Sequence, residues 1–261
     1  MVPLRKVLLQ AILLACITPA VSQEKPLSPA DAAPSVDQIL DRMRQHEEYQ
    51  SKELKHYQAV RHYQVLYKGF DTTIAAKMDV EVNYDDASGK SFRILSLSGS
   101  KLLCEKVLKR AVESEKEASQ DKQSTALTSA NYNFRLTGTE VIEGRPAYVL
   151  HVEPVREGKF LYRGNVWVDA VDYAVEKIEV EPAKNPSFWI TRTDIKNTNS
   201  QIQGMWLPQK NRSESKIRIG GTAVLTIDYG TYQIALTGEP QAEVNAPASR
   251  QTKATETGVS H

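Results

Sequence analysis

The sequence predicts an α+β fold with two helices and about ten antiparallel strands. The strands are expected to form one large curved sheet that covers a helix. Two segments place apolar residues at helical spacing. Between and after them, apolar and polar residues alternate over segments near ten residues long, which is typical of strands with one solvated face. Short polar turns join these segments, and short turns favour antiparallel neighbours.

The first residues predict export. A basic start, MVPLRK, precedes the apolar run VLLQAILLACITPAVS, and Ala20-Val21-Ser22 fits a small-x-small cleavage site, so 1–22 is a predicted signal peptide. The run is too short for a confident membrane span. Leu13 to Cys16 also resembles a bacterial lipobox, in which Cys16 becomes a lipidated N-terminus. We therefore expect either a soluble periplasmic protein or one anchored to a bacterial membrane through Cys16.

The composition of the chain after the signal peptide indicates its domain organisation and excludes some kinds of partner and cross-link. Residues 23–34 are rich in proline and 237–261 almost lack large apolar residues, so we expect a disordered linker and a disordered tail around a folded domain at 35–236. The chain has 33 Lys and Arg against 32 Asp and Glu, which argues against nucleic acid as a partner. Cleavage after Ser22 leaves Cys104 as the only cysteine, and one cysteine cannot form an intramolecular disulfide.

The folded part opens with a predicted helix. Ser35 and Gln38 have the spacing of a capping box, and the helix continues to about Lys52. Strands follow at 59–69 and 76–84, and SFRILSLS begins the return strand. The strand at 76–84 has the clearest alternation in the chain, with Met78, Val80 and Val82 on one face.

A second helix, 100–118, lies inside a long insertion at 100–130. Cys104 on this helix is interpreted as a small buried hydrophobic residue. Alternation then resumes, and Gly220-Gly221 is a predicted hairpin turn. The strands predicted after the insertion are 131–137, 139–143, 146–154, 159–169, 173–181, 187–195, 203–218 and 222–235.

Five carboxylates crowd the segment from Gly164 to Pro182. Asp169 and Asp172 flank a predicted turn, where aspartate stabilises the backbone. Glu179 and Glu181 share one strand face at roughly 7 Å, a separation used by inverting glycosidases, so a hydrolase is one alternative. Lys177 lies on that face too, and we favour a solvated outer surface. Histidine spacing does not suggest a metal site, nucleophile motifs are lacking, and we expect no cofactor.

Three segments carry a resemblance to a known family. GRPAYVL (144–150), GNVWVD (164–169) and YAVEKIE (173–179) resemble the central strands of the bacterial outer-membrane lipoprotein-sorting superfamily. This superfamily includes the periplasmic Lol carrier, its outer-membrane acceptor, and sensor domains that restrain envelope-stress anti-sigma factors. The resemblance covers about 131–182, and its motifs are hairpin signatures rather than catalytic ones.

The resemblance implies an unclosed antiparallel β half-barrel whose apolar concave face is covered by helices and takes lipoprotein acyl chains or another lipid-like ligand. It favours a non-enzymatic, periplasmic or outer-membrane-associated carrier or chaperone for lipoprotein transport. The alternative is an envelope-stress regulatory module that binds an inner- or outer-membrane protein. Arg61 is the candidate for the carrier's cavity arginine. The expected cavity residues are Tyr63, Tyr67, Met78, Val80, Val82, Phe134, Tyr148, Leu150 and Trp167.

Overall fold

A computed structural model describes residues 33–238 of the chain. The predicted signal peptide, Cys16, most of the linker at 23–34 and most of the tail at 237–261 lie outside these residues, so the expectations about them stay predictions.

Helices and strands of the described part follow one another in the predicted order. The helical elements are α1 (Val36–Glu53), α2 (Lys101–Leu103), the π-helical turn η1 (Cys104–Leu108), α3 (Lys109–Gln120) and α4 (Lys122–Thr125). The strands are β1 (Leu54–Lys68), β2 (Thr73–Asp85), β3 (Gly89–Gly99), β4 (Tyr132–Ile142), β5 (Arg145–Pro154), β6 (Tyr162–Asp169), β7 (Val175–Pro182), β8 (Ile190–Ile202), β9 (Met205–Ile217), β10 (Thr222–Asp228) and β11 (Tyr232–Leu236).

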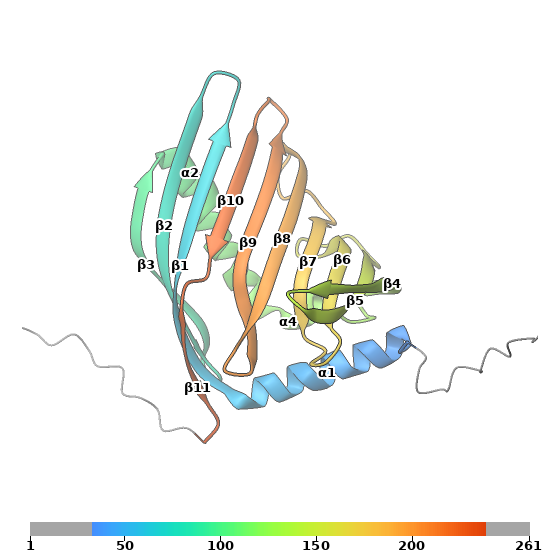
Figure 1. Cartoon of the computed structure of the whole chain (residues 1–261). Coiled ribbons are helices and arrows are strands. Elements are labelled where there is room, and N and C mark those ends of the chain that lie inside the picture. Colours follow the sequence, from blue (N-terminus) through green and yellow to red (C-terminus); the bar gives the residue numbers. More distant parts are fainter. Residues whose placement is uncertain (1–32, 239–261) are drawn as a thin grey trace, which may run out of the picture. The chain divides into compact units, whose positions relative to one another are not determined.

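All eleven strands form one antiparallel sheet in the order β3-β2-β1-β10-β9-β8-β7-β6-β5-β4, with β11 pairing β1 off this path. The strands β3 and β4 at the two ends do not pair with each other, so the sheet curves without closing (Figure 1). This confirms the predicted α+β class with a curved antiparallel half-barrel.

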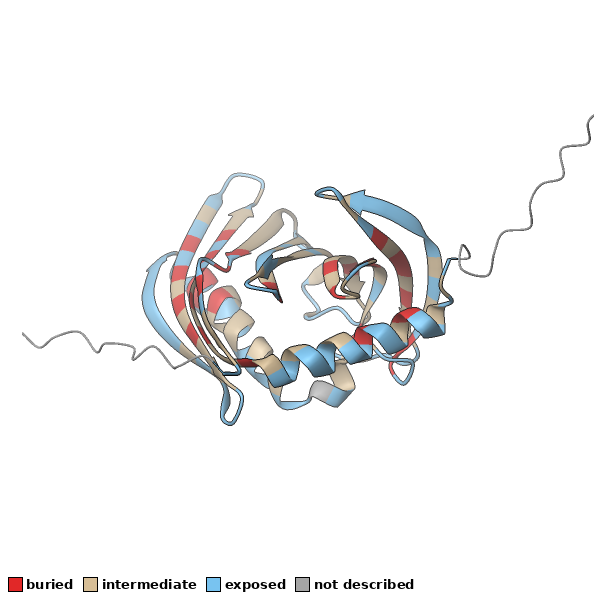
Figure 2. Ribbon diagram, turned by 60° about the horizontal axis from the view of Figure 1, so that its bottom comes forward, coloured by how far each residue is buried: buried red, intermediate tan, exposed pale blue. Residues whose placement is uncertain are grey.

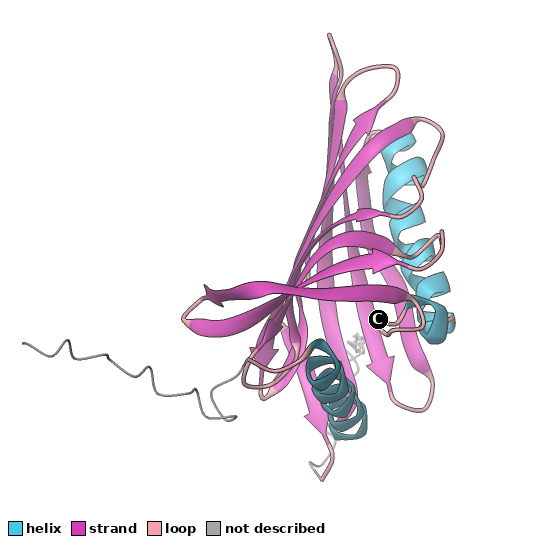
Figure 3. Ribbon diagram, turned by 90° about the vertical axis from the view of Figure 1, so that its right-hand side faces the viewer, coloured by secondary structure: helices cyan, strands magenta, loops and turns pink. Residues whose placement is uncertain are grey.

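Helix α1 begins where the sequence predicted. The Ser35 hydroxyl accepts a hydrogen bond from the Gln38 backbone N–H at 3.2 Å, and the Gln38 side chain accepts one from the Ser35 N–H at 2.8 Å. Ile39 and Met43 are its buried residues. The helix ends directly at β1, and it crosses one end of the sheet, as Figures 1 and 3 show.

The predicted second helix is present as α2, η1 and α3, which follow one another without a break from Lys101 to Gln120. It lies along the concave face of the sheet and contacts β1, β2 and β3 (Figure 3). Leu103, Cys104 and Leu108 are buried against these strands, which confirms the interpretation of Cys104. Both expected helices therefore cover the concave side.

The concave side holds two separate apolar cores. The first core joins β1, β2, β9 and β10 to the inserted helix, and includes Tyr63, Met78 and Leu108. The second joins α1 to β4, β5 and β6, and includes Ile39 and Leu150. No buried residue of the described chain belongs to both. Figure 2 shows buried residues along the strands of both arms of the sheet, with α1 crossing from one arm to the other.

Two predicted strand boundaries were wrong. The segments 131–137 and 139–143 are one strand, β4, because Gly138 is accommodated by a register shift between Leu136 and Gly138. The segment 222–235 is two strands, β10 and β11. Gly230 separates them with a φ of 59°, which glycine adopts without strain, and its N–H donates to the Asp228 carboxylate. Because of this break, β10 pairs with residues 62–68 of β1, and β11 pairs with residues 54–59 of the same strand.

Candidate functional site

A hollow of about 340 Å³ lies between α1 and the concave face of the sheet. Below we call it the α1 recess. Met43 and Gln50 line it from the helix, while Tyr57 of β1, Tyr84 of β2 and Trp206 of β9 line it from the sheet. These elements belong partly to the first core and partly to the second, so the recess lies where the two cores fail to meet. Its remaining lining residues are His46, Glu47, Ser51, Leu54, Lys90, Tyr173, Ala174, Val175, Asn199, Leu207 and Pro208.

A second hollow of about 300 Å³ lies on the other side of the same helix, against residues 127–129. Met43 and Glu47 line both hollows. Glu47 is accessible to solvent, yet desolvation raises the pKa of its carboxyl group. Exposure and a raised pKa occur together when a side chain faces a water-accessible hollow and has protein on its other sides. Glu47 thus places an acidic group inside the concave space.

Helix α1 is fastened over the recess by a two-way amide contact. The Gln50 side chain donates to the Trp206 carbonyl at 2.9 Å and accepts from the Trp206 N–H at 3.2 Å. The Trp206 indole N–H in turn donates to Asp172 at 3.0 Å. These bonds tie the C-terminal half of α1 to β9 and to the turn between β6 and β7. The N-terminal half is held by the burial of Ile39 and Met43.

Arg61 lies next to the recess, inside the first core, and its side chain is 1% exposed. Its guanidinium donates to Glu115 of α3 at 2.6 Å and lies 4.5 Å from the centre of the Tyr229 ring. Burial opposes the charged form, but the facing Glu115 carboxylate leaves the pKa of Arg61 raised overall. Its Nε has no hydrogen-bond partner.

Glu115 joins this buried charge to the recess. Its second carboxylate oxygen accepts from Lys90 at 3.1 Å, and Lys90 lines the recess. Desolvation raises the pKa of Glu115, but the charges of Arg61 and Lys90 lower it by more, so it is lowered overall. The three residues form a continuous polar connection from the first core to the recess wall, and Glu115 is the link that the inserted helix supplies.

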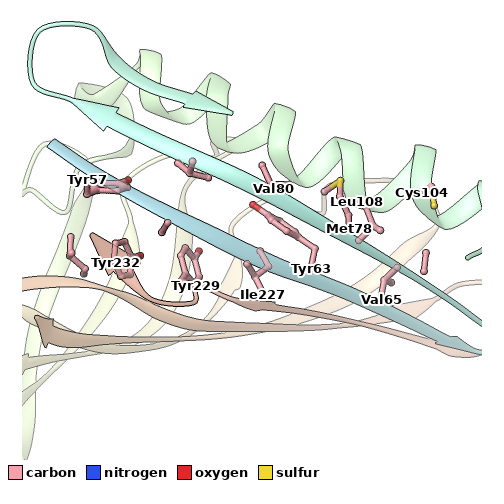
Figure 4. Packing of buried hydrophobic residues seen from close by; sticks show 14 of the residues in the cluster. Tyr57, Tyr63, Val65, Met78, Val80, Cys104, Leu108, Ile227, Tyr229 and Tyr232 are labelled. Atoms are coloured by element: carbon pink, nitrogen blue, oxygen red, sulfur yellow. The ribbon is translucent and has the colours of Figure 1, made fainter. Parts of the chain in front are cut away.

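The expected cavity residues divide into three groups. Tyr63, Met78, Val80 and Val82 are buried in the first core together with Leu103 and Leu108 of the inserted helix, and Tyr67 packs at its margin. Figure 4 shows Met78 and Val80 on the strand below the helix that carries Leu108. Leu150 is buried in the second core, with Phe134 and Tyr148 packed against it. They face the concave side as expected, but the helices already cover them, and none of them lines the recess.

Trp167 does not share that face. It pairs with Val149, whereas Leu150 pairs with Val166, and side chains alternate along both strands. Trp167 therefore packs with Ala147 and Val149 in a small cluster on the opposite side of the sheet. Its indole N–H donates to Glu140 at 2.9 Å, and the Lys177 ammonium lies 4.1 Å from its ring centre. The expectation that Trp167 lines the concave cavity was wrong.

Asp169, Asp172, Glu179 and Glu181 have the roles predicted as the favoured interpretation, whereas Glu176 is buried. Asp169 accepts from the backbone N–H groups of Val171 and Asp172, and Arg145 binds both of its carboxylate oxygens. Glu179 is paired with Lys177 and Lys196 on the outer face. Desolvation raises its pKa, but the two lysines outweigh this and lower it, which keeps Glu179 ionised and unsuited to act as a general acid.

Glu181 is paired with Arg192. Among residues 33–238 there is no group of three or more His, Cys, Asp or Glu placed to hold a metal ion. The described helices include none with the length and apolar character needed to cross a membrane. The α1 recess and the Arg61–Glu115–Lys90 connection are the features on which the proposed function below is built.

The recess itself was not found from the sequence. Tyr57 and Tyr84 continue the inward-facing rows of β1 and β2, and this alternation could have indicated that both side chains face the concave side. Their meeting with Trp206 depends on strand order, because β9 lies two strands from β1 in the sheet and about 150 residues away in the chain. Likewise, Arg61 and Glu115 are 54 residues apart. Neither contact leaves a pattern in a single sequence.

Comparison with known proteins gives distant structural likenesses. No family model matches the chain, and no curated protein matches it. A DUF1329 family protein from Desulfovibrio piger is 12% identical, with a TM-score of 0.41 over 77% of this chain and 94% of that one. A putative outer membrane lipoprotein-sorting protein domain from Vibrio parahaemolyticus is 10% identical, with a TM-score of 0.36 over 76% and 93%.

A LolA superfamily protein from Nitrosomonas europaea is 13% identical, with a TM-score of 0.34 over 80% of this chain and 96% of that one. The superfamily that residues 131–182 resemble is thus represented among the matched structures, as the sequence predicted.

Proposed function

We propose that the chain is a non-enzymatic binding protein for a lipid-like ligand, an acyl chain with a polar end, which occupies the α1 recess. The observation that carries the proposal is the recess itself, a hollow of about 340 Å³ between two apolar cores. This volume lies in the range of small-molecule sites. Each methylene that enters such a site contributes about 0.8 kcal/mol.

The lining supports an amphiphile rather than a plain hydrocarbon. Met43, Leu54 and Leu207 offer apolar contacts, and Tyr57 and Tyr84 add stacked rings with centroids 5.2 Å apart. Polar and charged side chains are fewer and lie on both walls, namely His46, Glu47, Gln50 and Ser51 from α1 and Lys90 and Asn199 from the sheet. An apolar chain with a hydrogen-bonding end group satisfies both kinds of lining.

The proposal is tested by a substitution that reduces the volume of the recess without disturbing either core. Ser51 lines the recess but is exposed, so Ser51→Phe places a ring in the hollow without removing a buried group. Displacement of about two methylenes of ligand weakens binding about tenfold. The matched control is Lys52→Phe, the next residue of α1, which is exposed and does not line the recess.

The measurement is a titration of the exported chain with a fluorescent fatty acid, together with native mass spectrometry of the chain after mild purification. We expect uptake by the original chain and by Lys52→Phe, and weaker uptake by Ser51→Phe. Equal affinities for both variants would place the ligand elsewhere. If no probe binds and no lipid co-purifies, the envelope-stress regulatory module that binds a membrane protein becomes the better hypothesis.

We also propose that the chain works outside the cytoplasm, since its first residues have the form of an export signal. The mass of the mature N-terminus distinguishes a soluble periplasmic protein, which begins at Gln23, from one anchored through a lipidated Cys16.

A further inference from the structure

The end of the sheet opposite α1 carries three neighbouring loops. They join β1 to β2, β7 to β8, and β9 to β10. Lys68 at the end of β1 pairs with Thr222, Thr222 pairs with Lys216, and Ile217 pairs with Ile190 at the start of β8. The strand ends are therefore level, and the loops meet at one edge, the upper end of the sheet in Figure 1.

Large apolar side chains project from all three loops. Phe70 is 87% exposed, Phe188 71%, Trp189 56% and Ile219 70%. We call these four residues the hairpin-tip patch. Single exposed apolar residues are ordinary on a protein surface, but four large ones on adjacent loops mark an interaction site.

The loops of the patch hold one another in place. The Arg218 N–H donates to the Trp189 carbonyl at 2.8 Å, and the Arg218 side chain donates to the Phe188 carbonyl at 3.0 Å. The guanidinium of Arg218 lies 4.6 Å from the Phe188 ring centre. A side chain in place of the Gly220 hydrogen would come within 2.2 Å of the Phe70 ring, so Phe70 rests directly on that glycine. The patch is one surface rather than three independent tips.

The backbone at these tips already has internal hydrogen-bond partners. Gly69 donates to Thr72 at 2.8 Å, Ile190 to Ser187 at 3.1 Å and Gly220 to Ile217 at 2.9 Å. A loop that enters the apolar part of a bilayer must satisfy its backbone groups internally, because no water is there to do so. These bonds satisfy part of the backbone of each tip internally, as entry into such a surface requires.

The charge around the patch is positive. Residues 68–72, 183–189 and 216–221 contain Lys68, Lys184, Lys216 and Arg218 against a single acid, Asp71. Lys68, Lys184, Lys216 and Arg218 are exposed. Basic residues near a membrane surface are attracted by anionic lipids, and tryptophan favours the interface between headgroups and acyl chains.

We propose that the hairpin-tip patch docks the protein on the surface of an anionic lipid bilayer, with Phe70, Phe188, Trp189 and Ile219 entering the interface and the four basic residues lying against the headgroups. The proposal is independent of the α1 recess, which lies at the other end of the same strands. Docking of this kind holds the protein on the membrane in one orientation, with the patch toward the lipid.

The chain contains its own reporter for this contact. Of its three tryptophans, Trp167 and Trp206 are buried and Trp189 is exposed. Lipids brominated on their acyl chains quench only tryptophans that reach the bilayer, so quenching measures the position of Trp189. The exported chain with Cys16→Ser is used, so that no acyl anchor contributes. The vesicles are phosphatidylcholine, alone or with phosphatidylglycerol.

We expect the chain to float with phosphatidylglycerol vesicles, to bind them less as salt is raised, and to show quenching of Trp189 by brominated lipid. Phe70→Ser with Phe188→Ser removes two apolar anchors and weakens binding at least about tenfold. The matched control is Val141→Ser with Val171→Ser, two equally exposed apolar residues outside the patch. Lys68→Gln with Lys184→Gln weakens binding to anionic vesicles only.

Three results would overturn the proposal: absence of binding to either vesicle, binding without quenching of Trp189, or equal loss of binding in the patch and control variants. Circular dichroism of every variant excludes unfolding as the cause. Since fatty acid uptake by the α1 recess is measured without vesicles, failure of docking and failure of the proposed function are distinguishable.

Discussion

Replacement of Glu115 by glutamine leaves the buried Arg61 guanidinium without a counter-charge while preserving shape and one hydrogen-bond acceptor. Arg61 is 1% exposed, and its contact with Glu115 is 2.6 Å. Removal of one partner of a fully buried ion pair costs about 3–5 kcal/mol. Glu115 is partly accessible, with 25% of its side chain exposed, so we expect the lower end, about 3 kcal/mol in the free energy of unfolding.

The assay is urea denaturation followed by circular dichroism, supported by thermal melting. For a domain of this size a loss of about 3 kcal/mol lowers the melting temperature by about 6–12 °C. Glu113→Gln is the matched control, because Glu113 lies on the same helix in an exposed pair with Arg110 and should change stability by less than about 0.5 kcal/mol. Arg61→Met combined with Glu115→Gln should restore part of the lost stability, since no buried charge then remains.

The pH dependence gives the same pair a second test. The folded pKa of Glu115 is depressed below its ordinary value of 4.5. The stability that ionised Glu115 contributes is therefore complete above pH 4.5 and is lost as the pH falls through the lower folded pKa. Glu115→Gln should lack this part of the acid-induced loss. A stability cost below about 0.5 kcal/mol, or an unchanged acid limb, would refute the reasoning that the pair fastens the inserted helix.

Two further variants test local claims by the same denaturation assay. Glu176 is buried and its Oε2 has no hydrogen-bond partner. Desolvation, followed by the charge of Asp169, raises its pKa, so the folded state resists its ionisation. Glu176→Gln should raise stability by about 1 kcal/mol at pH 7, and the gain should vanish below pH 4.5, where the carboxyl is protonated in both states; a loss of stability at pH 7 would contradict this. Ser35→Ala removes one half of the capping box and should cost about 1 kcal/mol, whereas Ser35→Asp, which keeps an acceptor, should cost little; equal costs would show that the cap does not act through its acceptor.

Local patterns predicted the elements well, because each depends on residues close in sequence. The spacing of Ser35 and Gln38 located the start of α1, and the alternation through Met78, Val80 and Val82 gave β2 and its inward face. The errors arose where a partner strand decides the outcome. Gly138 is absorbed as an irregularity because β5 continues past it, and the chain breaks at Gly230 because β1 is long enough to pair two strands in succession.

The site was harder to predict, because its residues are brought together by elements that are distant in sequence. Inward-facing residues of β1 and β2 were expected to line an open cavity, and they do face inward. Whether such a residue lines a hollow or lies beneath a helix depends on where the insertion packs. Leu103 and Leu108 cover Tyr63, Met78 and Val80, whereas no buried residue from α3 reaches Tyr57 and Tyr84. The hollow therefore appears at an end of β1 that no local pattern of residues distinguishes from the other.

Helices α1 and α3 differ in how much they bury, and we expect this difference to decide which of them yields to a ligand. Helix α1 buries Ile39 and Met43, is bound to Trp206 through Gln50, and continues without a break into β1. Helix α3 has no fully buried residue of its own; Ala111 and Val112 pack partly buried against the first core, and Glu115 pairs with Arg61 and Lys90 beside the recess. We expect the segment with less burial to lose to open first. We therefore expect Glu115→Gln to speed fatty acid release from the α1 recess, while Glu113→Gln leaves the release rate unchanged.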